Sequence, residues 1–119
     1  MPICDLEFIK EITPGSYTFP INVIELFLKE TPERIEKLKV AISNSNWEET
    51  YAIAHKIKPG VLMLGFPHDS SDALLSILRN TKEEKHLEET KGLFKTFSKD
   101  IDAIYKDLAH SLSLMKKGV

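Results

Sequence analysis

The sequence has little of what secreted, membrane-spanning or nucleic-acid-binding proteins require. It contains one cysteine in 119 residues, so no intramolecular disulfide can form and a reducing cytoplasm is the expected compartment. No stretch reaches the roughly 20 apolar residues of a membrane span, and the N-terminus lacks a signal-peptide pattern. Lys and Arg number 16 against 18 Asp and Glu, so the positive field of a nucleic-acid binder is missing. We expect a soluble protein with neither nucleic acid nor membrane as partner.

Motifs for catalysis and metal binding are also scarce. There is no Gly-x-x-x-x-Gly-Lys loop and no Gly-x-Ser-x-Gly sequence, so nothing indicates a kinase, a hydrolase or a bound nucleotide. Di-metal helical bundles take a Glu-x-x-His pair from each of two helices, whereas this chain has one such instance, at 83–86. We predict no metal, no other cofactor and no enzyme activity of its own.

The length suits one domain, since single domains usually span roughly 100 to 200 residues. Apolar residues recur at helical spacing from Pro20 to Ile42, which predicts a long helix with a kink or break at Thr31-Pro32. Asn46 is the expected cap of a second helix, which ends at Gly65 and Pro67. We therefore treat residues 1–119 as a single domain that begins with this helical pair.

Two more long helices follow in the pattern. The third is capped by Asp69, Ser70 or Ser71 and runs to a polar break that starts at Asn80, and the last and longest runs from Glu83 to about Lys116. No alternating pattern or Asn-Gly turn indicates a strand. With a short segment at 5–12 over one end, these helices predict an all-α fold, an antiparallel up-and-down four-helix bundle with a short extra N-terminal helix.

One histidine lies on the wrong face of the second helix for a core residue. At about 100° per residue, Ile53, Ile57 and Val61 share one side, and His55 lies nearly opposite. It should therefore face water. By composition alone, an incidental surface histidine is the commoner interpretation.

Lys58 gives His55 a possible chemical role. Side chains three residues apart are neighbours on a helix, so the Lys58 ammonium can reach the surroundings of the imidazole, and Lys56 adds positive potential. A neutral exposed imidazole can attack a phosphoryl group, and lysine then offsets the incoming negative charge. The pair predicts a site of phosphoryl transfer.

Three further residues share this exposed face. Pro59 comes four residues after His55 and removes the helical donor of the His55 carbonyl, which either bends the helix to fit the bundle or presents the imidazole to a partner. Tyr51 and Leu62 leave an apolar border around the histidine. Such a border can form the dry rim of a docking site. We predict that Tyr51, Lys56, Pro59 and Leu62 bind a partner.

The string AHKIKPGVLMLG, at 54–65, resembles the phosphorylation motif of histidine-containing phosphotransfer (HPt) domains. The family pattern has an Ala-His pair, a lysine three positions after the histidine and a Leu-Gly ending, which match Ala54-His55, Lys58 and Leu64-Gly65. The preceding run of helix, polar turn and second helix is also similar to that family. The resemblance covers most of the chain.

The resemblance implies a four-helix bundle in which His55 is the phosphoacceptor and Lys58 supports the phosphoryl group. Its partners would be receiver domains of hybrid histidine kinases and response regulators, between which family members relay phosphoryl groups without binding ATP. The chain would act as a monomer. It departs from the pattern at Pro59, where many members have glycine, and Gly60 follows one place late. The rival hypothesis is therefore an adaptor of the same fold that docks a signalling partner without being phosphorylated.

Overall fold

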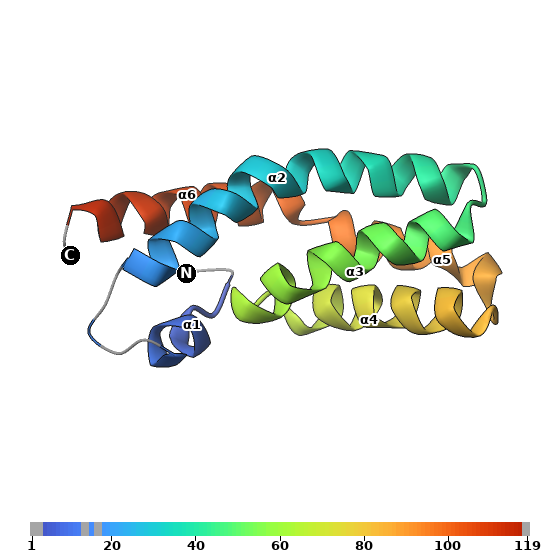
Figure 1. Ribbon diagram of the computed structural model, residues 1–119, viewed down its shortest axis with the longest axis horizontal. Helices are drawn as coiled ribbons and strands as arrows, with labels where there is room; N and C mark the ends of the chain where they lie inside the picture. Colours follow the sequence, from blue (N-terminus) through green and yellow to red (C-terminus); the bar gives the residue numbers. More distant parts are fainter. Residues whose placement is uncertain (1–3, 13–14, 16–17, 118–119) are drawn as a thin grey trace.

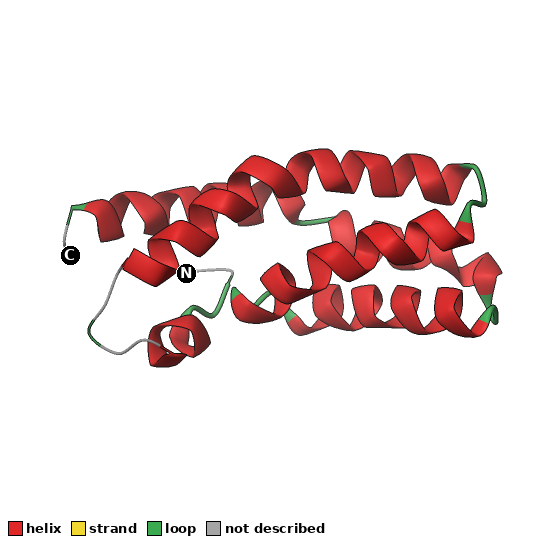
Figure 2. Cartoon of the chain, viewed as in Figure 1, coloured by secondary structure: helices red, strands yellow, loops and turns green. Residues whose placement is uncertain are grey.

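The computed structural model describes residues 4–12, 15 and 18–117, and all regular structure in these ranges is helical (Figure 2). In chain order the helices are α1 (Glu7–Ile12), α2 (Thr18–Ser43), α3 (Trp47–Met63), α4 (His68–Glu83), the 3-10 helix η1 (Leu87–Glu89), α5 (Thr90–Ser98) and α6 (Ile101–Lys116). The predicted all-α fold is confirmed.

The helices form an elongated body with principal extents of 46 × 23 × 22 Å. Helix α2 packs against α3 and α6, α3 packs against α4, and α4 packs against α5. Figure 1 shows α2, α3 and α4 running along the long axis, with α6 behind the N-terminal half of α2. Within the described ranges, no helix combines the length and the apolar character needed to cross a membrane.

One apolar core joins these helices. Its largest fully buried side chains come from six of them: Ile9, Ile24, Leu38, Ile57, Leu74, Ile77, Phe97, Ile104 and Leu108. Each such side chain contributes about 1.5–3 kcal/mol when it leaves water. The core thus holds α3 firmly between α2 and α4, and the exposed face of α3 is displayed on a rigid base.

A kink or a break was expected at Thr31-Pro32. Helix α2 is one continuous helix of 26 residues that contains Pro32, so the break is wrong, and the kink stays a prediction. Thr31 is buried and Pro32 is half-buried. The lost backbone hydrogen bond at a proline is outweighed here by packing, since α2 contacts α3, α5 and α6. Helix α2, and not the last helix, is the longest.

Helix α4, which is the third of the four predicted long helices, is longer than predicted at both ends. It begins at His68 with Pro67 as its N-cap and without a side-chain cap, so Asp69, Ser70 and Ser71 lie inside the helix. At the other end it passes the expected polar break and stops at Glu83. The reason lies in Thr81, whose hydroxyl donates to the Ile77 carbonyl at 2.7 Å, because that bond satisfies a polar group within a buried helical turn.

The single last helix expected from Glu83 to Lys116 is wrong. Glu84 and His86 adopt left-handed φ angles of 55° and 56°, which separate α4 from η1. A second interruption follows Ser98, whose hydroxyl donates to the Phe94 carbonyl at 2.8 Å. Asp100 leaves the helical conformation, with a φ of −108° and a ψ of 15°, and a new helix, α6, starts at Ile101 (Figure 1).

The N-terminal segment closes one end of the body. Asp5 caps α1 by accepting a hydrogen bond from the Glu7 amide at 3.1 Å. Its own amide donates to the Gly65 carbonyl at 2.8 Å, and the Cys4 amide donates to Oδ2 of Asp107 at 3.1 Å. The segment before α1 is thereby tied to the end of α3 and to α6.

Candidate functional site

Helix α3 carries the predicted site, and its ends are where the sequence predicted them. The Asn46 side chain accepts a hydrogen bond from the Glu49 amide at 3.2 Å. The negative charges of Glu48 and Glu49 in the first turn interact favourably with the positive end of the helix dipole. Gly65 ends the helix with a φ of 64°, a left-handed conformation that glycine adopts without penalty. Because Asn46 and Gly65 define the two ends of α3, the side of the helix on which each residue between them lies follows from the helical repeat.

The two faces of α3 differ as the helical spacing predicted. Its buried residues are Thr50, Ile53, Ala54, Ile57 and Val61. His55 lies on the other side and is exposed, Lys56 and Pro59 are exposed, and Lys58 is half-buried. Leu62 keeps 45% of its surface accessible. The structure therefore brings the predicted site residues onto one accessible face and its margin.

All four histidines are exposed, but their helical or chain neighbours differ in charge. His68 has Asp69 and Asp72 near it in sequence on α4, His86 lies 4.0 Å from a carboxylate oxygen of Glu89, and His110 follows an aspartate by three residues. Residues three and four positions away from His55 include one cation and no acid. A negatively charged phosphoryl group is thus least opposed at His55.

The imidazole of His55 has an aromatic neighbour. The ring of Tyr51, one turn earlier, lies with its centroid 5.7 Å from the imidazole centroid, and the two planes are 31° apart. Tyr51 is half-buried and packs against the core. In the part of the chain that the structure describes, no hydrogen bond or ion pair engages the His55 side chain. The imidazole is therefore accessible and has no competing polar partner there.

Pro59 and Gly60 have different surroundings. Pro59 lies inside α3, so the carbonyl of His55 lacks its usual helical donor. Gly60 faces α2, where a Cβ would stand 2.7 Å from Cδ2 of Phe27. Gly60 therefore permits close packing of α3 on α2, while the proline ring occupies the accessible surface.

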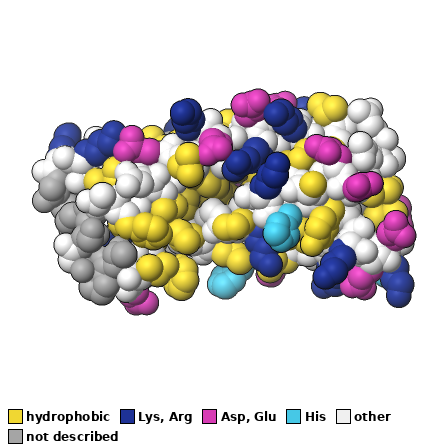
Figure 3. All heavy atoms as spheres, viewed as in Figure 1, with side chains coloured by type: hydrophobic (Ala, Val, Ile, Leu, Met, Phe, Trp, Pro, Cys, Tyr) yellow, Lys and Arg dark blue, Asp and Glu magenta, His cyan; other side chains and the backbone are white. Residues whose placement is uncertain are grey.

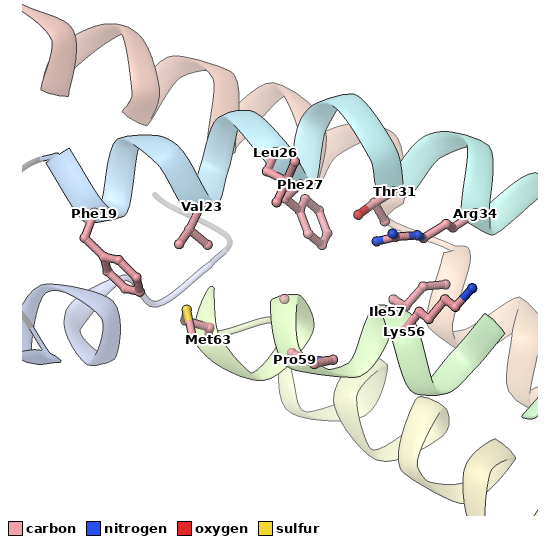
Figure 4. Close-up of a pocket in the computed structure, with 11 residues that line it drawn as sticks. Phe19, Val23, Leu26, Phe27, Thr31, Arg34, Lys56, Ile57, Pro59 and Met63 are labelled. Atoms are coloured by element: carbon pink, nitrogen blue, oxygen red, sulfur yellow. The ribbon is translucent and has the colours of Figure 1, made fainter. Parts of the chain in front are cut away.

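A groove of about 330 Å³ lies beside this face, between α2 and α3. Figure 4 shows apolar side chains of both helices directed toward it, with Arg34 and Lys56 at one end. Its apolar lining is Phe19, Val23, Leu26, Phe27, Ile57, Pro59 and Met63. In Figure 3 hydrophobic side chains gather where α2 and α3 run side by side, next to lysine and arginine side chains. Pro59 and Lys56 belong to both the groove and the His55 face.

The α2 side of this groove was not predicted from the sequence. Leu26 is 57% exposed and falls outside the buried stripe of α2, so an apolar residue on the polar face was the available signal. Arg34 carried no such signal, because its place beside Lys56 depends on how α2 packs on α3. Among the described residues, no three His, Cys, Asp or Glu side chains gather as metal ligands do.

Comparison with known proteins gives one match. The model of a family described as the Hpt domain matches residues 22–103, a range that runs from the start of α2 into α6 and includes the whole of α3. No curated protein and no solved structure matches the chain.

Proposed function

Because the chain belongs to the Hpt domain family, a family of phosphotransfer carriers in two-component signalling that are not kinases, we propose that His55 is the residue that carries its phosphoryl group. The observation that carries this proposal is the setting of His55 on α3. It is exposed, without a polar partner among the described residues, one turn from Lys58 and without an acid among its helical neighbours. None of the other three histidines combines these properties.

The proposed step is a displacement at phosphorus. A lone pair of a neutral His55 nitrogen attacks the phosphorus of an aspartyl phosphate on a receiver domain. The N–P bond forms as the P–O bond to the carboxylate breaks, and that electron pair leaves with the aspartate. The ring then releases the proton of its other nitrogen to water. Transfer to a second receiver reverses these steps.

We assign Lys58 the role of stabilising the negative charge of the phosphoryl oxygens in this step. Phosphoryl transfer depends mainly on positioning and on stabilising charge over the oxygens of the transferred group. Lys58 is half-buried, so its stem is held by packing while the ammonium can extend toward the phosphoryl oxygens. Any metal that assists belongs to the receiver.

The receiver is proposed to dock across the His55 face and the adjoining groove. Tyr51, Pro59 and Leu62 supply the apolar margin that excludes water, and the groove between α2 and α3 extends it. Lys56 at the groove end suits an acidic residue of the partner, while Arg34 beside it already pairs with Glu30 at 3.0 Å. The receivers meant are those of hybrid histidine kinases and response regulators.

Three further expectations accompany this role. We propose that α5 and α6 together form the fourth arm of an antiparallel up-and-down four-helix bundle, that residues 1–119 act as one domain, and that the protein works as a monomer, which leaves the His55 face free. A cytoplasmic location stays a prediction from the single cysteine.

The adaptor alternative retains one observation in its favour. Pro59 stands where many family members have glycine, and it lines the groove, so a partner could dock there without using the imidazole. The two functions differ in what His55→Gln does. A carrier loses phosphoryl transfer, whereas an adaptor keeps all of its function.

Intact-mass analysis at neutral to alkaline pH tests the carrier function after incubation with a phosphorylated receiver. Phosphohistidine is acid-labile, so we expect one phosphoryl increment that brief acid treatment removes. His55→Gln should lack it, and the matched variant His110→Gln, which changes another exposed histidine, should keep it. No increment with any of several receivers, or an increment that persists in His55→Gln, would reject the proposal and favour the adaptor.

A further inference from the structure

The contact between Tyr51 and His55 joins a fixed ring to a free one. Tyr51 is half-buried and packs against the core, whereas His55 is exposed. Their centroids are 5.7 Å apart with planes 31° from parallel, a separation at which aromatic rings attract each other. Among the described residues, the Tyr51 ring is the one interaction partner identified for the imidazole.

We propose that Tyr51 is a positioning residue for His55: its ring lies beside the imidazole and restricts the rotation of that side chain. The inference rests on the proposed role of His55 as phosphoacceptor. It assigns Tyr51 a task within the chain itself, in addition to the contact with a partner that the sequence suggested.

The physical reason is the freedom of an exposed histidine. Without a hydrogen bond, an imidazole on a helix surface samples several rotamers, and only some direct a nitrogen toward an approaching phosphorus. A tyrosine has only two side-chain torsions and is held here by packing, so it can restrict its neighbour with little further loss of entropy. Attack then proceeds from a preorganised ring.

The same contact should protect the product. The Tyr51 ring lies beside the imidazole, so it limits the approach of water to a phosphorylated ring from that direction. Val40, which is 57% exposed on α2, lies outside both the His55 face and the groove. Val40→Ala should therefore leave the orientation of His55 unchanged.

The first test needs no phosphoryl donor. In the nuclear magnetic resonance spectrum of the wild-type protein, ring protons of Tyr51 and His55 should show a nuclear Overhauser effect. Tyr51→Phe should keep this effect, and the His55 ring signals should shift in Tyr51→Leu but stay in place in Val40→Ala. Absence of the effect in the wild-type protein would overturn the inference, whatever the variants do.

The second test uses phosphoramidate, a small donor that requires no docking surface. Tyr51→Leu should be phosphorylated at His55 about three- to tenfold more slowly than the wild type, because the imidazole is less well positioned, and Tyr51→Phe should restore the rate. Val40→Ala should match the wild type. Equal rates in wild type and Tyr51→Leu would overturn the inference.

The two proposals fail in different ways. If receivers phosphorylate His55 but the rings are not in contact and the rates are equal, the positioning role is wrong and the carrier function stands. If the rings are in contact and phosphoramidate reacts at His55 as expected, but no receiver donates, the positioning role stands and the relay is wrong. Circular dichroism of each variant checks that it is folded.

Discussion

Gly60 of α3 lies so close to Phe27 of α2 that a Cβ on the glycine would stand 2.7 Å from Cδ2 of the ring. The glycine that follows one place late in the phosphorylation motif is therefore used to bring two helices together. It does not reduce the bulk of the surface beside His55, which Pro59 occupies. In this chain a glycine in this part of the motif therefore serves helix packing, at Gly60, and does not leave room for a docking partner beside His55.

Gly60→Ala should lower stability by up to about 2 kcal/mol. A methyl group would press on the buried Phe27 ring, and overpacking of this kind usually costs about 1–3 kcal/mol, which exceeds the gain of about 1 kcal/mol from replacing glycine by alanine in a helix. Urea unfolding followed by circular dichroism measures the difference. The matched control is Gly92→Ala in α5, where nothing lies within 4 Å of the added Cβ and a gain of about 0.5–1 kcal/mol is expected. Equal effects of the two substitutions would contradict the packing role of Gly60.

Gly65→Ala should release the N-terminal segment from the end of α3. Gly65 has a φ of 64°, and a Cβ there would collide with the Asp5 carbonyl. We expect a loss of about 1–3 kcal/mol, and a rate of Cys4 thiol labelling at least about tenfold higher as the segment is displaced. Gly15→Ala is the control, because Gly15 has a similar φ of 78°, but no atom of the described residues lies within 4 Å of an added Cβ. Gly15→Ala should lose only the stability that the left-handed backbone costs an alanine, and the rate of Cys4 thiol labelling should stay as in the wild type.

Stability should fall at alkaline pH partly because of Cys4. Burial, and then the charge of Asp107, raise the pKa of the Cys4 thiol from 9.0 to about 12. The unfolded thiol therefore ionises first, so the unfolded state binds fewer protons and stability decreases as pH rises from about 9 to about 12. Tyr105, whose pKa burial raises to about 12, adds to the decrease. Urea midpoints at pH 8 and pH 10.5 should differ less in Cys4→Ala than in the wild type, and an identical difference would refute the assignment.

The sequence predicted α3 and its orientation well because the determinants are local. Asn46 and Gly65 act through their own backbone and side-chain geometry, and 100° per residue then places His55 away from the core. The fold family followed from the same segment. Nothing beyond α3 itself was needed for this part of the site.

The remaining helices were less predictable because tertiary contacts decided them. Pro32 and Thr81 both carry local signals of interruption, yet each lies within a helix that packing or a side-chain hydrogen bond sustains. The interruption after Ser98 had no strong local signal. The groove beside His55 was equally hidden, because it depends on the distance between α2 and α3 and not on either helix alone.

Lys58 and Lys56 should affect different steps of transfer. Lys58→Ala should slow phosphorylation of His55 at saturating receiver by about 10²-fold, the usual cost of removing one group that stabilises charge in a transition state. Lys56→Ala should leave that maximal rate unchanged and raise the receiver concentration needed to reach half of it, because Lys56 lies at the groove end. Rapid-quench kinetics over a range of receiver concentrations separates the two. The same kinetic change in both variants would mean that the lysines act only through general positive potential.

Pro59 can be tested for its two possible effects by two substitutions. Pro59→Ala restores the N–H that the His55 carbonyl lacks, while Pro59→Gly restores it and also removes the whole side chain at position 59. Some receivers are partners of family members that have glycine at the position of Pro59. If the proline ring obstructs the docking of such receivers, Pro59→Gly should bind them about three- to tenfold more tightly than the wild type. The affinity of Pro59→Ala should increase less. Equal gains would instead assign the effect to the helix bend that the missing hydrogen bond permits. Titration of each variant with a panel of receivers measures this, and unchanged affinities throughout would show that Pro59 does not govern the choice of partner.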